Sequence, residues 1–487
     1  MVQHVSTATD VLGTVYWANA VAGNPYSINL PNQTGGGNCL ILALSCPYSA
    51  SRTVTVSDDQ SNTWQLAVST HNTSVISSIY IATNVHANTQ KVTVTFDTGL
   101  YSCQFVLSEF YNVAAGAAID TTAASQASAA PSVNAGSMTT VSGGDLIYNY
   151  AYDQANSSLA AGSGVSVGGI TGGTGFSLLS ADVFIGDFAQ YYVQPSAGAI
   201  TPSATVSGVT DTFNSVAVAL KASSGQGTAP SPTAIRIVRV CHFMVNSSTP
   251  IQFPCVGNLI LFATARPESA IDYSAVTSQP SNSWTKIDES LVNGHGPAQV
   301  WYATNAQASL NLNLTVTGTP GPHGTTLVFY DVVNAGAYDT GAGRPSSYLV
   351  TISPTQLFSN FCPITPSQPG ELIFDFLQCS FGPVVVVSPG TMDSVLYGGE
   401  TDSDLMDNAD GYAHYYSNST STTSFSYTMN SGVHLRSQEV GIAIAFSAAS
   451  PTPTPNPTAP GLLGVRPQAL SAPGAASHHY GRNLVGP

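Results

Sequence analysis

The stretch Asn38-Cys-Leu-Ile-Leu42 returns in the second half of the chain as Gly257-Asn-Leu-Ile-Leu261. Leu40 to Leu44, which includes the end of the first stretch, and Val440 to Phe446 are continuous apolar runs, which favour strands buried on both faces. Outward from them, further segments match in the same order: 61–64 with 281–284, 80–84 with 301–305, 109–113 with 330–334, 144–147 with 370–373, 189–192 with 413–416, and 216–220 with 442–446. Matched positions lie 219 to 226 residues apart. Such a collinear set indicates two copies of one domain.

These matches divide the chain into four segments. The first copy covers residues 1–222 and the second covers 234–449, with a Gly/Ser/Pro linker at 223–233 between them. From Ser450 the sequence Ser-Pro-Thr-Pro-Thr-Pro-Asn-Pro-Thr opens a tail, 450–487. Alternating prolines cannot pair into a sheet and favour polyproline II. We therefore expect the tail to be largely irregular.

The composition favours strands over helices. Asp, Glu, Lys and Arg make up only 8% of the 487 residues, against about 25% in average proteins. The solvated faces must then be Ser, Thr, Asn and Gln, which suit strands and turns. Segments 91–96 and 311–317 alternate as half-buried strands do. With about eight to ten strands expected in each copy, the prediction is an all-β chain of two tandem antiparallel β-sandwich domains, jelly-roll-like, plus the Pro-rich tail.

Charge narrows the range of partners. The formal net charge is −15, and only three residues are lysines. Without a basic cluster, a phosphate backbone would be repelled, so nucleic acid is not an expected partner. Since no apolar run reaches the length of a membrane span, no span is expected either.

The seven cysteines show no zinc-type spacing. Cys39 and Cys46 lie too far apart along one extended strand to pair with each other. Cys241 with Cys255, or Cys362 with Cys379, could join neighbouring strands, but buried thiols are the preferred interpretation. The redox compartment stays open at this stage.

No catalytic motif stands out, and no catalytic residue is predicted. Glu109 and Asp331 occupy nearby positions of the repeat and are the pair that a glycosidase would need. Their surroundings, an acid between apolar and aromatic residues, favour loop or strand-end structure instead.

Two groups of residues are weak candidates for binding. Tyr191 and Tyr192 match Tyr415 and Tyr416; in a strand, one of each pair faces outward and would suit sugar stacking or a protein interface. The only cofactor considered is Ca²⁺, whose oxygen ligands could come from a cluster of acids in the second copy: Asp402, Asp404, Asp407 and Asp410. Their spacing is not that of an EF-hand, and a solvated loop is the preferred interpretation. The repeated Trp64 and Trp284 indicate a role in packing.

The series Asp58 to Trp64, Ile79 to Asn84, Val92 to Phe96 and Glu109 to Val113 resembles uncharacterised β-sandwich modules, jelly-roll or concanavalin-like, of bacterial extracellular proteins and phage structural proteins. The resemblance spans most of both copies and implies no catalytic residues. The second copy has Pro280 where the first has Gln60, and it lacks the Asp pair of that loop.

The expected function is therefore a non-enzymatic structural or adhesive protein of a virion, such as a decoration, fibre or tail-associated subunit, or of an extracellular filament. The expected partners are proteins in a homo-oligomeric or particle assembly, and cell-surface polysaccharide is a further candidate. The alternatives are a secreted polysaccharide-binding protein and, third, a concanavalin-like glycosidase. The opening Met1-Val-Gln-His-Val has no signal-peptide pattern, which favours a virion surface, with an extracellular site as the other option.

Overall fold

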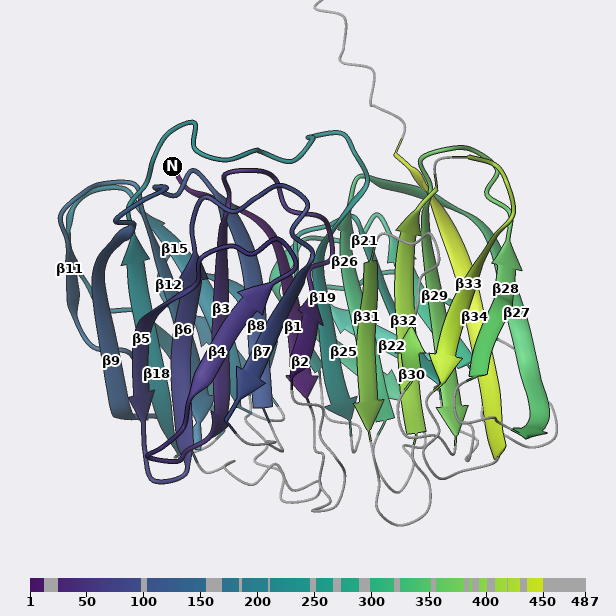
Figure 1. Ribbon diagram of the computed structural model, residues 1–487, viewed down its shortest axis with the longest axis horizontal. Coiled ribbons are helices and arrows are strands. Elements are labelled where there is room, and N and C mark those ends of the chain that lie inside the picture. The colour runs from purple at the N-terminus through teal and green to yellow at the C-terminus, as the bar shows by residue number, and fades with distance from the viewer. Residues whose placement is uncertain are drawn as a thin grey trace, which may run out of the picture. The chain divides into compact units, whose positions relative to one another are not determined.

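A computed structural model describes the chain from residue 1 to 449, apart from 13–24, 98–102, 155–168, 184–185, 209–210, 246–250, 266–272, 289–297, 319–324, 352–355, 381–384, 388–393, 401–407, 418 and 430–435. The chain divides into two units, Met1–Ala449 and Ser450–Pro487. The predicted irregular tail coincides with the second unit and lies outside the described residues. The described residues of the first unit form β-sheets whose strands pair antiparallel, apart from one parallel pair described below, and this confirms the all-β prediction (Figure 1).

The first copy contains two successive groups of strands, here called modules 1 and 2. Module 1 comprises β1 (Gln3–Leu12), β2 (Tyr26–Asn29), β3 (Cys39–Pro47), β4 (Val54–Asp58), β5 (Gln65–His71), β6 (Val75–Ala82), β7 (Lys91–Phe96) and β8 (Cys103–Tyr111). Module 2 comprises β9 (Ile119–Ala129), β10 (Ser132–Asn134), β11 (Met138–Thr140), β12 (Asp145–Asp153), β13 (Gly169–Gly172), β14 (Ser177–Asp182), β15 (Asp187–Gln194), β16 (Gly198–Ile200), β17 (Ser203–Ser207) and β18 (Thr212–Leu220).

The second copy repeats this arrangement as modules 3 and 4. Module 3 comprises β19 (Arg236–Val245), β20 (Ile251–Cys255), β21 (Leu259–Ala265), β22 (Ala275–Gln279), β23 (Thr285–Asp288), β24 (Ala298–Thr304), β25 (Ser309–Thr317) and β26 (Thr325–Val333). Module 4 comprises β27 (Ala335–Thr351), β28 (Gln356–Ile364), β29 (Leu372–Ser380), β30 (Val385–Val387), β31 (Ser394–Glu400), β32 (Asn408–Tyr416), β33 (Thr423–Met429) and β34 (Arg436–Ala448).

All four modules share one strand order. Module 1 has a large sheet β1-β8-β3-β6-β5 and a small sheet β2-β7-β4. The large sheets of modules 2, 3 and 4 are β9-β18-β12-β15-β14, β19-β26-β21-β24-β23 and β27-β34-β29-β32-β31, and module 2 adds a short β11-β16 pair. This is jelly-roll order, except that the fifth strand joins the large sheet. Within the described residues this strand order therefore occurs four times, whereas the sequence matches above predict two copies.

The expected eight to ten strands describe one module, and each copy contains about twice that number. The predicted number of strands was too low because several strands lack the alternation of apolar and polar residues by which strands are recognised. Strand β9, for example, consists mostly of Ala, Ser and Thr, with Asp120, Gln126 and a single large apolar residue, Ile119. Small side chains of this kind do not mark the two faces of a strand.

The large sheet of module 1 is buried on both faces. On one face Leu40, Leu42 and Leu44 pack against the small sheet. On the other, Ile41 and Ala43 pack against the large sheet of module 2. Strand β3 therefore needs apolar residues on both faces, and its continuous apolar run correctly predicted a strand buried on both sides. The same layering in the second copy places Ile442, Ile444 and Phe446 between the large sheets of modules 3 and 4.

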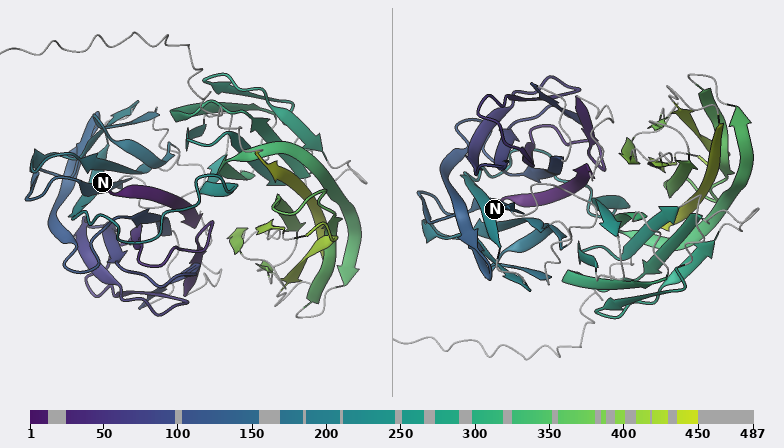
Figure 2. Two further views of the ribbon diagram at one scale, coloured as in Figure 1. Left: turned by 90° about the horizontal axis from the view of Figure 1, so that it is seen from above. Right: turned by 90° about the horizontal axis from the view of Figure 1, so that it is seen from below.

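The two copies join through the edges of two large sheets. Strand β1 pairs in parallel with β19, with Thr7 opposite Arg239, and this creates a ten-stranded sheet. Figure 2 shows β1, purple beside the N label, at the boundary between the copies. Strands β1 and β19 are equivalent edge strands, and they run parallel. The two copies are therefore related by an approximate twofold rotation about an axis along these strands, and this rotation turns equivalent faces of the two large sheets to opposite sides. Accordingly, β20 of module 3 lies against β14 of module 2, and β31 of module 4 lies against β2 of module 1.

The structure corrects the register of two sequence matches by one residue. Leu40 lies opposite Glu109 and Ile260 lies opposite Asp331, so Leu40 corresponds to Ile260 and not to Leu259. Such an error arises because a continuous apolar run carries no register information. Asn112 and Asn334 both have positive φ, at 65° and 59°, so the match of 109–113 with 330–334 is also shifted by one residue. The match of 80–84 with 301–305 holds, since Asn84 and Asn305 both have positive φ, at 56° and 54°.

The linker between the copies is held against the first copy. The amide of Thr228 donates to Asn38 Oδ1 at 2.7 Å, and the amide of Asn112 donates to the carbonyl of Gln226 at 2.7 Å. Gly227 has a φ of +84°, and a Cβ there would lie 2.2 Å from Asn38 Oδ1. Glycine is therefore required at this close approach.

Candidate functional site

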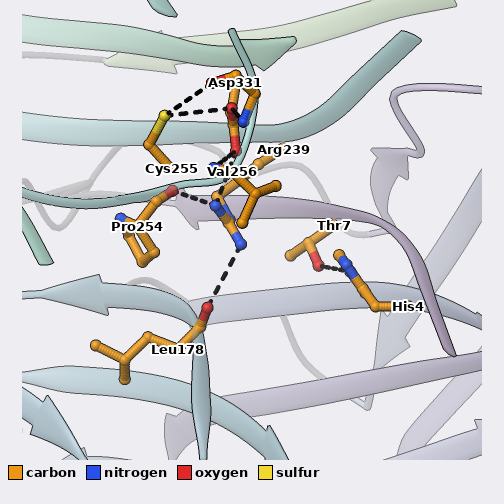
Figure 3. A network of polar contacts seen from close by, with 9 residues as sticks. His4, Thr7, Leu178, Arg239, Pro254, Cys255, Val256 and Asp331 are labelled. Carbon is orange, nitrogen blue, oxygen red and sulfur yellow. Dashed lines mark hydrogen bonds and ion pairs between the residues drawn. The ribbon is translucent and has the colours of Figure 1, made fainter. Parts of the chain in front are cut away.

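Charged side chains gather where the two copies meet, around Arg239 on β19 (Figure 3). Arg239 is 2% exposed and lies 3.1 Å from a carboxylate oxygen of Asp331, which is fully buried. Its guanidinium also donates to the carbonyl of Leu178 in module 2, at 3.4 Å, and to the carbonyl of Pro254. One side chain thus connects β19 and β26 with the first copy.

Asp331 receives several donors besides Arg239. The amides of Val256 and Gly257 donate to its two oxygens at 2.9 and 2.7 Å, and the Cys255 thiol lies 3.6 Å away. Burial raises the pKa of Asp331, against the opposing effect of Arg239 and of the two amides. These donors satisfy both oxygens of the buried carboxylate, as a buried acceptor requires.

Glu109 on β8 is the counterpart of Asp331 in the first copy. It is fully buried, and its Oε1 accepts hydrogen bonds from Asn38 Nδ2 at 2.6 Å and from the amide of Gly35 at 3.0 Å. Burial raises its pKa to about 7, above the usual value near 4.5. A raised pKa is typical of a catalytic acid. Because the side chain is fully buried and its Oε1 is occupied, this carboxyl does not present itself to a substrate.

The raised pKa of Glu109 predicts a pH-dependent stability. Between about pH 4.5 and 7 the unfolded chain loses a proton that the folded chain keeps, so stability falls as pH rises through this window, by on the order of 3 kcal/mol. Glu109→Gln keeps an oxygen acceptor for Asn38 and cannot ionise. Relative to the wild type, the variant should therefore gain stability between pH 4.5 and 8, as measured by urea unfolding. A difference between the two proteins that does not change with pH would contradict this assignment.

The four tyrosines proposed for binding are half-buried. Tyr191 packs against His4 and Phe110, with ring centroids 5.7 and 5.4 Å away. Tyr192 lies 5.4 Å from Phe176, on the opposite side of the sheet. The hydroxyl of Tyr416 donates to Asn32 Oδ1 at 2.8 Å, between the copies.

The register also differs at these tyrosines, because Ile147 pairs with Tyr192 and its counterpart Ile373 pairs with Tyr415. Tyr192 therefore corresponds to Tyr415, and the counterpart of Tyr191 is the buried His414, which hydrogen-bonds to the carbonyl of Pro31 at 2.6 Å. The side chains of Tyr191 and His414 thus make contacts inside the first unit. A binding role for the tyrosines stays a prediction.

The proposed calcium ligands fall mostly outside the described residues. Asp402, Asp404 and Asp407 are outside the described residues. Asp410 belongs to β32 and is described only by its backbone, which pairs with Gln378 of β29. Within the described ranges, no group of three or more His, Cys, Asp or Glu side chains is arranged to hold a metal ion. Likewise, no described helix is long and apolar enough to cross a membrane.

The loop before each repeated tryptophan is locked by one acceptor. In the first copy Asp58 accepts hydrogen bonds from the amides of Gln60 and Asn62, at 2.9 and 3.0 Å, and from the indole of Trp64 at 2.8 Å. In the second copy Ser278 takes the same position and accepts from Asn282 and Trp284. Both indoles pack on the core of their module. The expected packing role of the tryptophans is confirmed, and the shared Ser-Asn-Xaa-Trp pattern is the signature of this loop.

The second copy provides a control for this loop, because Ser278 replaces Asp58 there. Asp58→Ala removes the acceptor for three donors and should lower the free energy of unfolding of the first copy by about 2 kcal/mol. Asp58→Ser copies the second copy and should cost less than half as much. Urea unfolding followed by tryptophan fluorescence measures both values. Equal losses for the two variants would mean that the acceptor does not hold the loop.

Six cysteines are buried and carry thiols that form no disulfide, as the sequence favoured: Cys39, Cys46, Cys103, Cys241, Cys255 and Cys362. The side chain of Cys379 lies outside the described residues.

The fold and these contacts define the class of protein: an all-β chain whose described residues form repeated antiparallel modules of eight strands, with two more in module 2. Comparisons with protein-family models, with curated proteins and with solved structures find no match. The sequence resemblance to extracellular and phage modules therefore stays a prediction. Chemically, the cluster around Arg239 and Asp331 can hold two copies together.

Proposed function

We propose that this chain is a non-enzymatic structural protein that serves on the surface of a virion or in an extracellular filament, with other copies of itself or particle proteins as partners. The observation that supports this most is the fourfold repetition of one jelly-roll strand order. Jelly rolls recur in viral capsid and lectin domains. This is an analogy at the level of the fold, so it supports the proposal without assigning a site.

The buried carboxylates support the same proposal. Glu109 and Asp331, the pair that a glycosidase would need, are both fully buried and bonded to backbone amides. A glycoside hydrolase instead needs two carboxyl groups on either side of an accessible bond. Their arrangement favours a structural role.

Self-assembly is the test. Purified full-length protein at micromolar concentration should form defined oligomers by light scattering, and electron microscopy should show regular assemblies. A strictly monomeric protein that is also missing from purified particles would contradict the proposal.

A polysaccharide-binding protein is the second candidate, because lectins share the jelly-roll architecture. It predicts saturable sugar binding by calorimetry, weakened by Tyr192→Ala or Tyr415→Ala. A glycosidase is third, and it predicts polysaccharide cleavage that Glu109→Gln or Asp331→Asn abolishes. Saturable binding without assembly would favour the second candidate, and cleavage with this mutational pattern would favour the third.

A further inference from the structure

Two cysteines face each other across neighbouring strands of module 1. In the antiparallel ladder of β3 and β8, Leu44 lies opposite Phe105 and Ser45 opposite Gln104. One step further, the same register places Cys46 opposite Cys103. Residues directly opposite in such a ladder have Cα atoms about 4.5–5.5 Å apart and project to the same face. This separation lies within the range that a disulfide bridges.

The side chains confirm that the two thiols meet. Both project into the core between the large and small sheets of module 1, where Cys46 is 2% exposed and Cys103 is fully buried. Burial raises the pKa of Cys103, and the neighbouring Cys46 thiol raises it further. The pair is thus in position without any change of backbone register.

The pairing is a feature of the first copy alone. In the sequence, the corresponding residues of the second copy are Arg266, which lies outside the described residues, and Thr325. The fold therefore does not require sulfur at this place. The other buried thiol in the ladder of β3 and β8, Cys39, lies opposite Phe110, which makes it a matched control.

We propose that Cys46 and Cys103 are a redox site that closes into a cross-strand disulfide in an oxidising environment. The oxidant is a small disulfide such as oxidised glutathione. The thiolate of one cysteine attacks it, its S–S bond breaks, and a mixed disulfide forms with release of one glutathione. The thiolate of the second cysteine then attacks the protein sulfur of that mixed disulfide, the internal S–S bond forms, and a second glutathione leaves. The two thiol protons end on the two glutathiones, so the cysteines are oxidised by two electrons and the oxidant is reduced by two.

Burial sets the conditions for this reaction. A buried thiol with a raised pKa reacts slowly, because the thiolate is the nucleophile. The bond is therefore expected to form during folding, before the core closes, and to resist reduction afterwards. Since it would close a loop of more than fifty residues, it should restrict the unfolded chain and raise the thermal midpoint of module 1.

Refolding the full chain in two buffers tests the proposal. One buffer contains a mixture of oxidised and reduced glutathione, and the other contains a reducing agent only. After quenching by acid and alkylation under denaturing conditions, mass spectrometry of a digest should show Cys46 linked to Cys103 in the first buffer and both residues alkylated in the second. The thermal midpoint should be several degrees higher for the oxidised sample.

Variants separate the bond from its surroundings. Cys46→Ala/Cys103→Ala should abolish the shift between the two buffers, whereas Cys39→Ala should keep it. If the double variant does not fold, the linked peptide of the wild type still decides the question. Complete alkylation of both residues after oxidative refolding, or linkage of either one to another cysteine, would overturn the proposal.

Discussion

Replacing Arg239 by alanine is expected to lower the free energy of unfolding by about 3–5 kcal/mol, because the substitution leaves the carboxylate of Asp331 buried without its cation. The loss also removes donors to Leu178 and Pro254. The effect should therefore extend beyond module 3. Urea unfolding, followed by circular dichroism and by fluorescence, measures the loss.

The double variant Arg239→Met/Asp331→Leu provides the control for this prediction. With both charges removed and the volume kept, the cost should be small, or the protein should become more stable. A loss in the double variant as large as in Arg239→Ala would show that the position matters for packing and not for charge. A loss below 1 kcal/mol in Arg239→Ala would contradict the burial of this ion pair.

Phe110→Ala is expected to cost about 3–5 kcal/mol, as for other fully buried aromatic side chains. Phe110 lies between the two large sheets of the first copy, with its ring centroid 6.3 Å from that of Tyr148 in module 2 and 5.1 Å from that of His4. Because modules 1 and 2 share this core, their unfolding transitions should move together. The measurement is urea unfolding combined with hydrogen exchange of strands in both modules.

Leu66→Ala is the matched control for Phe110→Ala, since Leu66 is 51% exposed and lies on the outer strand β5. Its effect should stay within about 0.5 kcal/mol. If Phe110→Ala destabilised module 1 and left module 2 unchanged, the two modules would not share a core.

Much of the architecture could be predicted from the sequence. The all-β class follows from scarce charge, and the buried strands at Leu40 and Ile442 follow from continuous apolar runs. The fourfold repetition was not predicted, because its sequence signal is short: Gly257-Asn-Leu-Ile-Leu261 and Gly370-Glu-Leu-Ile-Phe374 lie at the third strand of modules 3 and 4. Topology depends on which strands pair, and many sequences satisfy the same pairing.

The polar contacts were harder to predict than the fold. Glu109 and Asp331 were correctly expected near strand ends, but their partners come from distant segments, such as Asn38 and Gly257. Arg239 carried no signal, since a single arginine in an apolar strand does not reveal its acceptors. The facing cysteines depend on the pairing of β3 with β8, and this pairing is visible only once the register is known.

The continuity of the ten-stranded sheet across the two copies is the central claim, and amide hydrogen exchange tests it most directly. In separate sandwiches, β1 and β19 would be edge strands with half of their amides open to water. In the joined sheet, the amides of residues 7–9 and 239–241 should exchange as slowly as those of β3, and more slowly than those of the outer strand β5. Fast exchange of alternate amides along β1 and β19, while β3 stays protected, would contradict the joined sheet.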